Sequence, residues 1–537
     1  MGADVRQGPD QVRLIQALRD PARFGPWCAG VRLAETHISY VLLTGRDAYK
    51  IKKAVKLPFL DFMTLESRRA DCERELALNR RFAPDLYLDV VAITGSADAP
   101  VVGGEGPAIE YAVRMREFPE DALLSRMLVR GELTASHIDG LAETIAAFHA
   151  AAPDAAPDAP FGAPDSVLDL ALENFDELQR LVEAEADRRA LADVRRWTRR
   201  EYDGCARTFA DRRRAGRVRE CHGDLHLGNI ALVEGLVTPF DCIEFNEAMR
   251  WSDVMGDVAF LVMDLRDRGR ADLASRFLNR YLEQSGDYGG VRVLRFFVVY
   301  RAMVRAKIAC LRASQEAPGP ARAAMREFHE YLALAARSAE PGRPGLVLTH
   351  GPSGSGKTTW TQAFIELTGA IRVRTDVERK RLHDAAPDAR SGSALNAGWY
   401  APAETERTYA ALADLARTIA GAGYVVVVVG TFLQRRHRRR FHDVAAGLDV
   451  PFVILDFVAR AETLRQRVDV RAAAGLDASD ADVHVLDEQL RTGEALDPDE
   501  QAATVTFDAD RPLAVAQDLR TWQPVLDRLQ VGCHIAM

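Results

Sequence analysis

Two segments of the sequence carry residues suited to phosphate chemistry. The first, HGDLHLGN at 222–229, is followed by PFD at 239–241. Transfer of a phosphoryl group needs in-line positioning and neutralisation of charge by a metal ion, with little covalent help from the protein. An Asp that orients the attacking hydroxyl, an Asn five residues later and an Asp on a following strand can supply this. The sequence offers them as Asp224, Asn229 and Asp241.

The stretch between Asn229 and Asp241 predicts how these residues meet. In IALVEGLVTPF, two short apolar runs lie on either side of Glu234 and Gly235. Apolar runs around a glycine-containing turn are typical of a β-hairpin. Such a hairpin would return Asp241 to face Asn229.

The second segment is GPSGSGKT at 351–358. It follows a buried apolar run, LVLTH, and precedes TWTQAFIEL, which reads as a helix. This is the context of a P-loop, in which glycines let backbone N–H groups wrap phosphates and the helix N-terminus adds partial positive charge. The lysine would reach the β- and γ-phosphate oxygens, and the first threonine would offer its hydroxyl to Mg²⁺. The expected nucleotide-binding residues are Gly351, Ser353, Gly354, Ser355, Gly356, Lys357, Thr358 and Thr359.

The elements around the two segments predict different folds. Around the P-loop, the apolar runs 346–350, 425–429 and 452–457 alternate with helical stretches. That alternation predicts a parallel sheet with helices on both faces, an α/β fold. In the first half, residues 31–58 read as a hairpin, 87–118 as further strands, and 64–82, 135–150 and most of 166–335 as helices.

At 537 residues the chain is too long for one ordinary domain. The Pro- and Gly-rich stretch SAEPGRPG at 338–345 is the best candidate boundary. We therefore expect an N-terminal domain at 1–337, a linker at 338–345 and a C-terminal domain at 346–537.

Composition excludes several classes of protein. A net charge of −8 argues against a general nucleic-acid binder, which is usually basic. The sequence contains no run of 18 or more apolar residues, so we expect no membrane-spanning helix. The first residues lack the apolar core of a signal peptide, so we do not expect secretion. The seven cysteines form no CxxC pair and are odd in number, which argues against a disulfide framework or a zinc site. We expect a cytoplasmic protein.

HGDLHLGN resembles the catalytic loop of the aminoglycoside phosphotransferase and choline-kinase-like branch of the protein-kinase fold, whose motif is H-G-D-x-x-x-x-N. The resemblance implies a bilobal α+β fold, with an N-lobe at about 30–118 and a C-lobe at about 119–337. It implies that Asp224 is the catalytic base and that Asn229 and Asp241 bind the metal. In the later WSDVMGDVAFLVMDL, it implies that Asp257, alone or with Asp253, braces the loop by hydrogen bonds.

Upstream, DAYKIKK resembles the kinase strand whose lysine contacts the nucleotide phosphates. By that resemblance the lysine is Lys50, held by Glu75 on the next helix. Lys52 is the alternative, because side chains repeat with period two along a strand, and Glu73 is the alternative partner. No Gly-rich GxGxxG loop precedes the strand; ETHISYVLL at 35–43 takes that place.

In the C-terminal half, IRVRTDVERKRL resembles the D-x-x-R strand end of gluconate-, shikimate-, adenylylsulfate- and polynucleotide-kinase relatives. There the Asp, here Asp376, orients the acceptor hydroxyl, and the Arg, here Arg379, grips the substrate. Arg467 and Arg471 share a helix face and resemble lid arginines that close on the phosphate. Val429 stands where these kinases have an acidic Walker B residue, which leaves transfer by this domain open.

The whole chain resembles bacterial two-domain proteins that fuse an aminoglycoside-phosphotransferase-like kinase to a P-loop ATP-binding kinase. This implies ATP and Mg²⁺ in both domains and a small-molecule acceptor with a hydroxyl. Two alternatives stay open. Val429 favours a nucleotide-sensing protein in which neither site transfers phosphate. The run RRHRRR at 435–440 suggests a kinase of nucleic-acid ends, although a solvated helix face is the preferred interpretation. The acceptor and the oligomeric state are not specified by the sequence.

Overall fold

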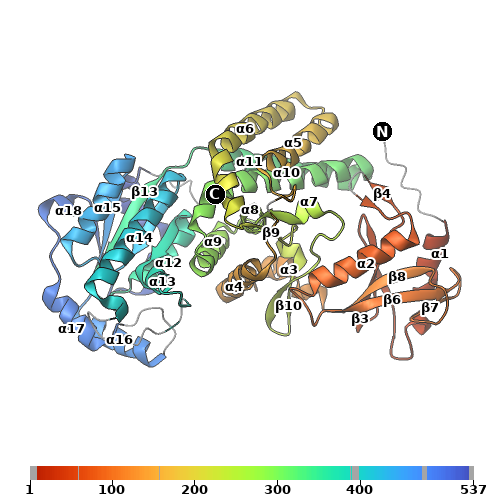
Figure 1. Cartoon of the computed structure of the whole chain (residues 1–537), viewed down its shortest axis with the longest axis horizontal. Coiled ribbons are helices and arrows are strands. Elements are labelled where there is room, and N and C mark those ends of the chain that lie inside the picture. The colour runs from red at the N-terminus through yellow and green to blue at the C-terminus, as the bar shows by residue number, and fades with distance from the viewer. Residues whose placement is uncertain are drawn as a thin grey trace. The chain divides into compact units, whose positions relative to one another are not determined.

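The computed structural model describes residues 9–57, 60–156, 158–386, 389, 398–474 and 481–530. The chain divides into two compact units, the first consisting of residues 1–166 and 211–261 and the second of residues 167–210 and 262–537. This division differs from the predicted linker at 338–345, because helices that precede the linker pack with the C-terminal sheet (Figure 1). The predicted domain limits therefore stay a prediction.

The first unit contains a six-stranded antiparallel sheet in the order β1-β2-β3-β8-β6-β7. Its strands are β1 (Arg32–Glu35), β2 (Ser39–Leu43), β3 (Asp47–Lys52), β6 (Tyr87–Gly95), β7 (Pro100–Val102) and β8 (Glu110–Arg116). The predicted hairpin at 31–58 is a larger meander of three strands, and residue 58 itself lies outside the described residues. Helix α2 (Leu65–Asn79) packs on the sheet through Cys72, while α1 (Pro9–Ala17) contributes Leu14 and Ile15 to a second apolar cluster.

The rest of the first unit carries the HGDLHLGN segment between short elements. They are η2 (Glu120–Ala122), α3 (Leu124–Val129), α4 (Ala135–Ala151), β9 (Val218–Glu220), η3 (Leu227–Asn229), β10 (Ile230–Val233), β11 (Leu236–Pro239), α7 (Glu247–Arg250), β12 (Trp251–Asp253) and the start of α8 (Met255–Asp267). Strands β10 and β11 form the predicted hairpin, with Ile230 opposite Pro239. Its turn residues Glu234 and Gly235 both have positive φ, 50° and 82°, as a tight two-residue hairpin turn requires.

The second unit has a helical part and a sheet. The helices before the linker are most of α5 (Pro164–Leu181) and α6 (Glu185–Arg214), together with α9 (Ala271–Ser285), α10 (Val291–Gln315) and α11 (Pro318–Ser338). The sheet has five parallel strands in the order β14-β15-β13-β16-β17. They are β13 (Gly345–His350), β14 (Ile371–Arg374), β15 (Val425–Val429), β16 (Phe452–Val458) and β17 (Thr504–Asp508).

Helices lie between these strands and after the last one, which confirms the predicted α/β fold. They are α12 (Lys357–Thr368), α13 (Thr375–Arg381), α14 (Pro402–Gly421), α15 (Arg435–Leu448), α16 (Ala461–Ala474), α17 (Val483–Thr492), α18 (Pro498–Ala502) and α19 (Gln523–Arg528). One face of the sheet packs on a core that includes Phe364 of α12 and Trp522. Strand β15, which consists of five valines, lies beside β13, which leads into the P-loop.

Helix α9 borders the edge strand β14. The side-chain amide of Asn279 donates to the carbonyl of Ala370 at 3.0 Å and accepts from the N–H of Arg372 at 2.7 Å. Asn279 is buried. One side chain of α9 thus takes the place that a neighbouring strand would have.

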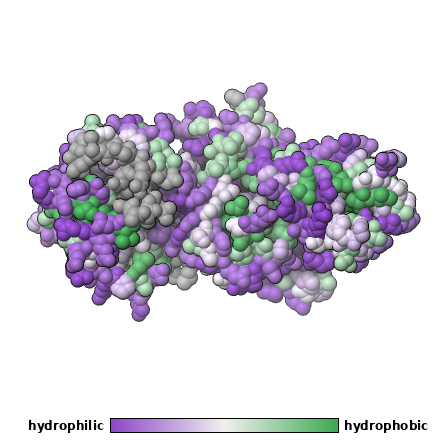
Figure 2. Space-filling model, turned by 90° about the horizontal axis from the view of Figure 1, so that it is seen from below, coloured by the Kyte–Doolittle hydropathy of each residue, from purple (hydrophilic) through white to green (hydrophobic). Residues whose placement is uncertain are grey.

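Hydrophilic residues predominate on the face shown in Figure 2, with smaller apolar patches among them. In the described part of the chain, no helix combines the length and the apolar character that crossing a membrane demands. Six cysteines are free and buried; the seventh, Cys533, lies outside the described residues.

Candidate active sites

In the first unit, strand β3 and helix α2 bring Lys50 to Glu75. The Lys50 Nζ lies 2.7 Å from Glu75 Oε1 and also forms an ion pair with Asp241. Burial by itself would lower the pKa of Lys50, but the Asp241 and Glu75 carboxylates outweigh it and raise this pKa well above its ordinary value. Glu73 instead pairs with Arg69 on the surface. Of the two candidate partners, the structure therefore places Glu75 beside the lysine.

Lys52 lies on the same strand but is completely buried. Its Nζ lies 2.5 Å from the second oxygen of Glu75 and 3.1 Å from Asp71, and it pairs with Glu244 as well. Burial raises the pKa of Glu244 to about 7. Glu75 thus bridges the two lysines, and Lys50 is the one that pairs with the predicted metal ligand Asp241.

The HGDLHLGN loop places Asp224 against Asn229. The Asn229 Nδ2 donates to Asp224 Oδ2 at 2.9 Å and to the Asp224 carbonyl at 3.1 Å. The Asp224 side chain is 37% exposed, so a hydroxyl group can reach it. The N–H of Phe240 donates to the Asn229 carbonyl at 2.9 Å, which closes the base of the hairpin. The hairpin therefore brings Asp241 next to Asn229, as the sequence predicts.

The backbone of Asp241 is held in a left-handed conformation with φ 60°. Its N–H donates to the Tyr87 hydroxyl at 3.1 Å, and the next N–H, of Cys242, donates to Asn79 Oδ1 at 2.9 Å. Asp tolerates this region better than most residues do. Tyr87 and Asn79 were missed by sequence reasoning, because they lie on β6 and α2, far away along the chain.

Asp257, at the start of α8, braces the loop. Its two carboxylate oxygens accept the N–H groups of His222 at 2.8 Å and of Gly223 at 2.9 Å. This confirms the predicted brace. The second candidate, Asp253, instead binds Arg212 through two hydrogen bonds of 2.7 and 2.8 Å.

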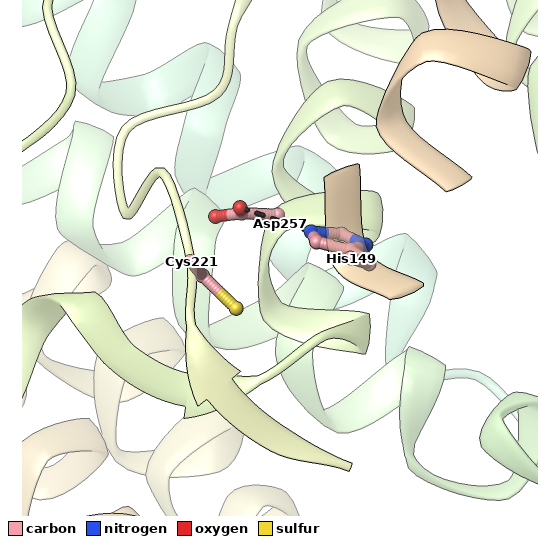
Figure 3. Close-up of side chains that lie close together, drawn as sticks. All are labelled: His149, Cys221 and Asp257. Atoms are coloured by element: carbon pink, nitrogen blue, oxygen red, sulfur yellow. Dashed lines mark hydrogen bonds and ion pairs between the residues drawn. The ribbon is translucent and has the colours of Figure 1, made fainter. Parts of the chain in front are cut away.

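Asp257 also lies beside His149 and Cys221 (Figure 3). Possible ligand atoms of the three buried residues lie within 4.8 Å of one another. The carboxylate already accepts the two backbone N–H groups and lies 3.3 Å from His149 Nε2, while the Cys221 thiol lies 3.4 Å from the Ser252 carbonyl. These contacts explain the cluster as support for the loop, without a metal ion.

In the second unit, the P-loop glycines are required by the backbone. Gly351, Gly354 and Gly356 have φ of 132°, 82° and 79°. A Cβ on Gly351 would come within 2.7 Å of the Phe457 carbonyl, and one on Gly354 within 2.8 Å of the Leu464 carbonyl. The loop therefore adopts the open curve whose N–H groups can hold an anion.

Lys357 is buried and bonds to its own loop. Its Nζ donates to the carbonyls of Gly351 at 2.9 Å and Pro352 at 2.7 Å, and to Ser355 Oγ at 3.2 Å. Burial lowers the pKa of Lys357 to about 7. A bound phosphate would give this ammonium group the opposite charge that it needs.

The N–H of Ser353 in the loop already has a side-chain partner. The Ser353 N–H donates to Gln489 Oε1 of α17 at 2.8 Å. No sequence pattern singles out Gln489. A phosphate that uses this N–H has to displace the glutamine side chain.

The P-loop opens into a cavity of about 610 Å³ that four predicted residues of this half also line: Asp376, Arg379, Arg467 and Arg471. Asp376 lies in the first turn of α13, not at the end of a strand, because β14 ends at Arg374. The sequence prediction was wrong on this local point.

Three of these residues show what the cavity could hold. Arg379 is 5% exposed, its guanidinium lies over the Tyr400 ring at 4.7 Å, and its Nε finds no partner among the described residues. Arg467 donates to the Gly354 carbonyl at 3.5 Å, and Arg471 donates to that of Ala481 at 3.0 Å. Guanidinium groups around a P-loop, here one buried and two partly buried, suit an anionic ligand.

The RRHRRR run begins α15 and forms ion pairs. Arg438 is fully buried and binds Glu500 at 2.7 and 2.8 Å. Arg440 binds Glu406 at 2.8 Å. The preferred interpretation of a solvated face is therefore wrong for Arg438, and the run does not form one continuous exposed cationic surface.

Binding of nucleotide at the P-loop is expected to take up a proton at alkaline pH. The pKa of Lys357 is depressed in the empty site, and adjacent phosphates would raise it toward the ordinary value of about 10.4. Proton uptake should therefore appear between about pH 7 and about pH 10, and affinity should fall as pH rises through this window. Calorimetry at pH 8.5 in two buffers of different ionisation enthalpy measures it. Lys50 should take up no proton when nucleotide binds, because its raised pKa keeps it protonated at this pH. Identical binding heats in the two buffers would contradict the expected proton uptake.

Comparison with known proteins also finds two different domains in the two halves of the chain. Residues 60–297 match the model of the Phosphotransferase enzyme family, and residues 346–496 match an AAA domain. Uncharacterized proteins of Mycobacterium bovis and Mycobacterium tuberculosis are 32% identical over 453 residues, which cover 84% of this chain and 88% of each relative.

Solved structures resemble separate parts of the chain. A sugar kinase from Janibacter sp. HTCC2649 is 23% identical and covers 36% of this chain and 99% of its own, with a TM-score of 0.28. A Plasmodium vivax ethanolamine kinase is 11% identical and covers 58% of this chain and 84% of its own, with a TM-score of 0.36. The chain belongs to the same family as the mycobacterial proteins and joins a domain of the Phosphotransferase enzyme family to an AAA domain.

Proposed function

We propose that the chain is an ATP- and Mg²⁺-dependent phosphotransferase, whose N-terminal domain, within 1–337, transfers the γ-phosphoryl group of ATP to a hydroxyl of a small molecule. The observation that carries the proposal is the joint placement of Asp224, Asn229 and Asp241 on one loop and hairpin, with Lys50 and Glu75 paired beside Asp241. Each group that this transfer requires is present and lies in one half of the chain.

Asp224 accepts the proton of the acceptor hydroxyl as the oxygen attacks the γ-phosphorus and the bond to the β-phosphate oxygen breaks. Asn229, by donating to Asp224, keeps the carboxylate turned toward the acceptor. The brace from Asp257 fixes the backbone of the loop at His222 and Gly223. The loop therefore meets the acceptor with its base already oriented, which is the main contribution a protein makes to this reaction.

The side-chain oxygens of Asn229 and Asp241 are hard donors of the kind that Mg²⁺ prefers. A bound Mg²⁺ would neutralise the charge of the phosphates. Lys50 now pairs with Asp241, so a cation on Asp241 would compete for the carboxylate and turn the ammonium group toward the phosphates. Glu75 holds Lys50 throughout, because Lys52 fixes the other carboxylate oxygen.

The C-terminal domain, within 346–537, binds ATP through the P-loop and is a candidate second kinase. Asp376 would orient an acceptor hydroxyl, Arg379 would bind the acceptor, and Arg467 and Arg471 would close on the phosphates. All four line the cavity of the P-loop.

A metabolite screen for ATP-dependent mass gain of one phosphate tests the proposal and assigns the site. The wild-type chain, Asp224→Asn and Lys357→Ala are compared with the same metabolites. Product lost only with Asp224→Asn supports transfer by the N-terminal site, and product lost only with Lys357→Ala assigns it to the P-loop. Product that persists unchanged in Asp224→Asn for every acceptor would overturn the proposed base.

A second candidate function is nucleotide sensing without transfer. The observation in its favour is Val429, which is buried at the end of β15 where an acidic residue would support Mg²⁺. A sensor would bind ATP and yield no phosphorylated product in the same screen. The third candidate, a kinase of nucleic-acid ends, gains little support from the ion-paired arginines of α15. Oligonucleotide affinity that does not fall with rising salt would count against it.

A further inference from the structure

A buried ion pair joins α9 to the P-loop sheet. Glu283, near the end of α9, accepts from Arg372 of β14 at 3.0 Å from Nε and 2.8 Å from a terminal nitrogen. The two side chains are 3% and 6% exposed. Burial would raise the pKa of Glu283, but the neighbouring Arg372 and Arg374 outweigh it and hold this pKa below its ordinary value. The pair is therefore charged. The other oxygen of Glu283 lies 3.8 Å from Arg280, a more distant second partner.

The guanidinium group of Arg372 also makes a contact that reaches the phosphate-binding turn. Its Nη1 donates to the carbonyl of Thr358 at 3.3 Å. Thr358 is the second residue of α12 and follows Lys357 directly. One guanidinium group thus links a carboxylate of α9 to the turn that presents Lys357 and the Thr358 hydroxyl to a nucleotide.

The same end of α9 also contacts α13. The carbonyl of Glu283 accepts from Arg381 at 2.7 Å. Gly286, which ends α9 with φ 69°, lies so close to Arg381 that an added Cβ would be 2.7 Å from its Nη1. Helix α13 carries Asp376 and Arg379, which line the cavity of the P-loop. The last turns of α9 therefore contact α13 directly and reach α12 through Arg372.

We propose that Glu283, acting through Arg372, positions the phosphate-binding turn of α12, so that residues 271–290 complete the C-terminal site although they precede the linker. Glu283 and Arg372 are positioning residues, since neither lines the cavity. The proposal rests on nucleotide binding at the P-loop and stands whether or not that domain transfers phosphate.

The proposed positioning depends on interactions that would be lost if the Glu283 carboxylate were removed. Without Glu283, Arg372 would remain as a buried cation with no compensating charge and would turn toward other acceptors or solvent. The Thr358 carbonyl would then lose a charge-assisted hydrogen bond, and the first turn of α12 would open more often. The effect should therefore appear in the P-loop itself, before any chemistry takes place.

Amide hydrogen exchange on the full-length chain tests this, with peptides covering 351–362 followed by mass spectrometry. In Glu283→Gln, exchange of these amides without nucleotide should be about tenfold faster, as the loss of one charge-assisted hydrogen bond implies. The MgATP concentration that gives half-maximal protection of the same peptides should rise by about tenfold. Because the peptides report only the P-loop, nucleotide bound at the N-terminal site does not enter the measurement.

Glu366→Gln is the matched control. It removes the Arg276–Glu366 ion pair of 2.8 Å, which also joins α9 to α12 but lies at the other end of α12. This variant should leave exchange at 351–362 unchanged. Equal exchange at 351–362 in Glu283→Gln and Glu366→Gln would overturn the proposal.

A double variant separates positioning from stability. Glu283→Gln with Arg372→Met leaves no uncompensated buried charge, so thermal stability should recover. Exchange at 351–362 should stay fast, because the Thr358 carbonyl still lacks the charged Arg372 donor, although the neutral Thr361 hydroxyl still donates to it at 3.2 Å. Recovery of both stability and slow exchange would assign Glu283 a purely structural role and overturn the proposal. If the proposed kinase function fails, no phosphorylated product appears, but the hydrogen-exchange result without nucleotide is unaffected.

Discussion

Asp224→Asn should lower the rate of phosphoryl transfer by the N-terminal domain by about 10²- to 10⁴-fold, the usual contribution of a general base. The amide cannot accept the hydroxyl proton, yet it keeps the size of the carboxylate and can still bond to Asn229. ATP affinity should change little, because Lys50, Glu75 and Asp241 remain in place. The measurement is steady-state transfer to the acceptor found in the metabolite screen.

Two additions make the result specific. A Lys357→Ala background removes turnover at the P-loop, so any remaining transfer comes from the first site. Asp121→Asn, an exposed aspartate of the same unit that pairs with Arg130, serves as the control and should leave the rate unchanged. Transfer within about threefold of the background rate would show that Asp224 is not the base, since this is less than the smallest general-base effect.

Lys52→Met should lower the free energy of unfolding by about 3–5 kcal/mol, as removal of one partner from a buried ionic group does. The methionine fills a similar volume but leaves Asp71, Glu75 and Glu244 without their shared cation. For a domain of this size the melting temperature should fall by on the order of 10 °C. Denaturant unfolding followed by circular dichroism measures the change.

Lys56→Met is the matched control for this substitution. Lys56 pairs with Asp61 at 2.6 Å, but both side chains are at least half exposed. Surface pairs of this kind contribute about 0–1 kcal/mol, so the control should be nearly as stable as the wild type. Equal stability of the two variants would mean that the buried carboxylates find other partners or become protonated.

Local patterns were sufficient to predict the parts of the site that are continuous in sequence. The hairpin from Ile230 to Pro239 follows from two apolar runs and a turn that contains Gly235. The P-loop follows from its glycines between a strand and a helix. In each case the residues that decide the geometry are neighbours in the chain, so the pattern contains the information.

The choice between Lys50 and Lys52 shows what local sequence patterns cannot decide. Period two places both lysines on one face of β3, and only the packing of α2 and Glu244 decides which one is enclosed. Tyr87 supports Asp241 from 154 positions away, and Gln489 reaches Ser353 from 136 positions away. Contacts at such separations depend on the whole fold, and no local spacing encodes them.

The domain division is harder to predict for the same reason. The stretch at 338–345 is rich in proline and glycine, yet α9 before it packs against β14 beyond it. A pattern of prolines and glycines marks where the chain is irregular, not which elements share a core.

The contact of Asn279 with β14 has a consequence for solubility. An edge strand with unpaired backbone groups is a template on which a second chain can add a strand and start aggregation. Here the carbonyl of Ala370 and the N–H of Arg372 are both occupied by one amide side chain. A fragment that begins at the linker would leave these two groups open. In the full chain, Asn279 therefore protects the edge of the C-terminal sheet from pairing with a second chain. A fragment intended for expression should begin before α9.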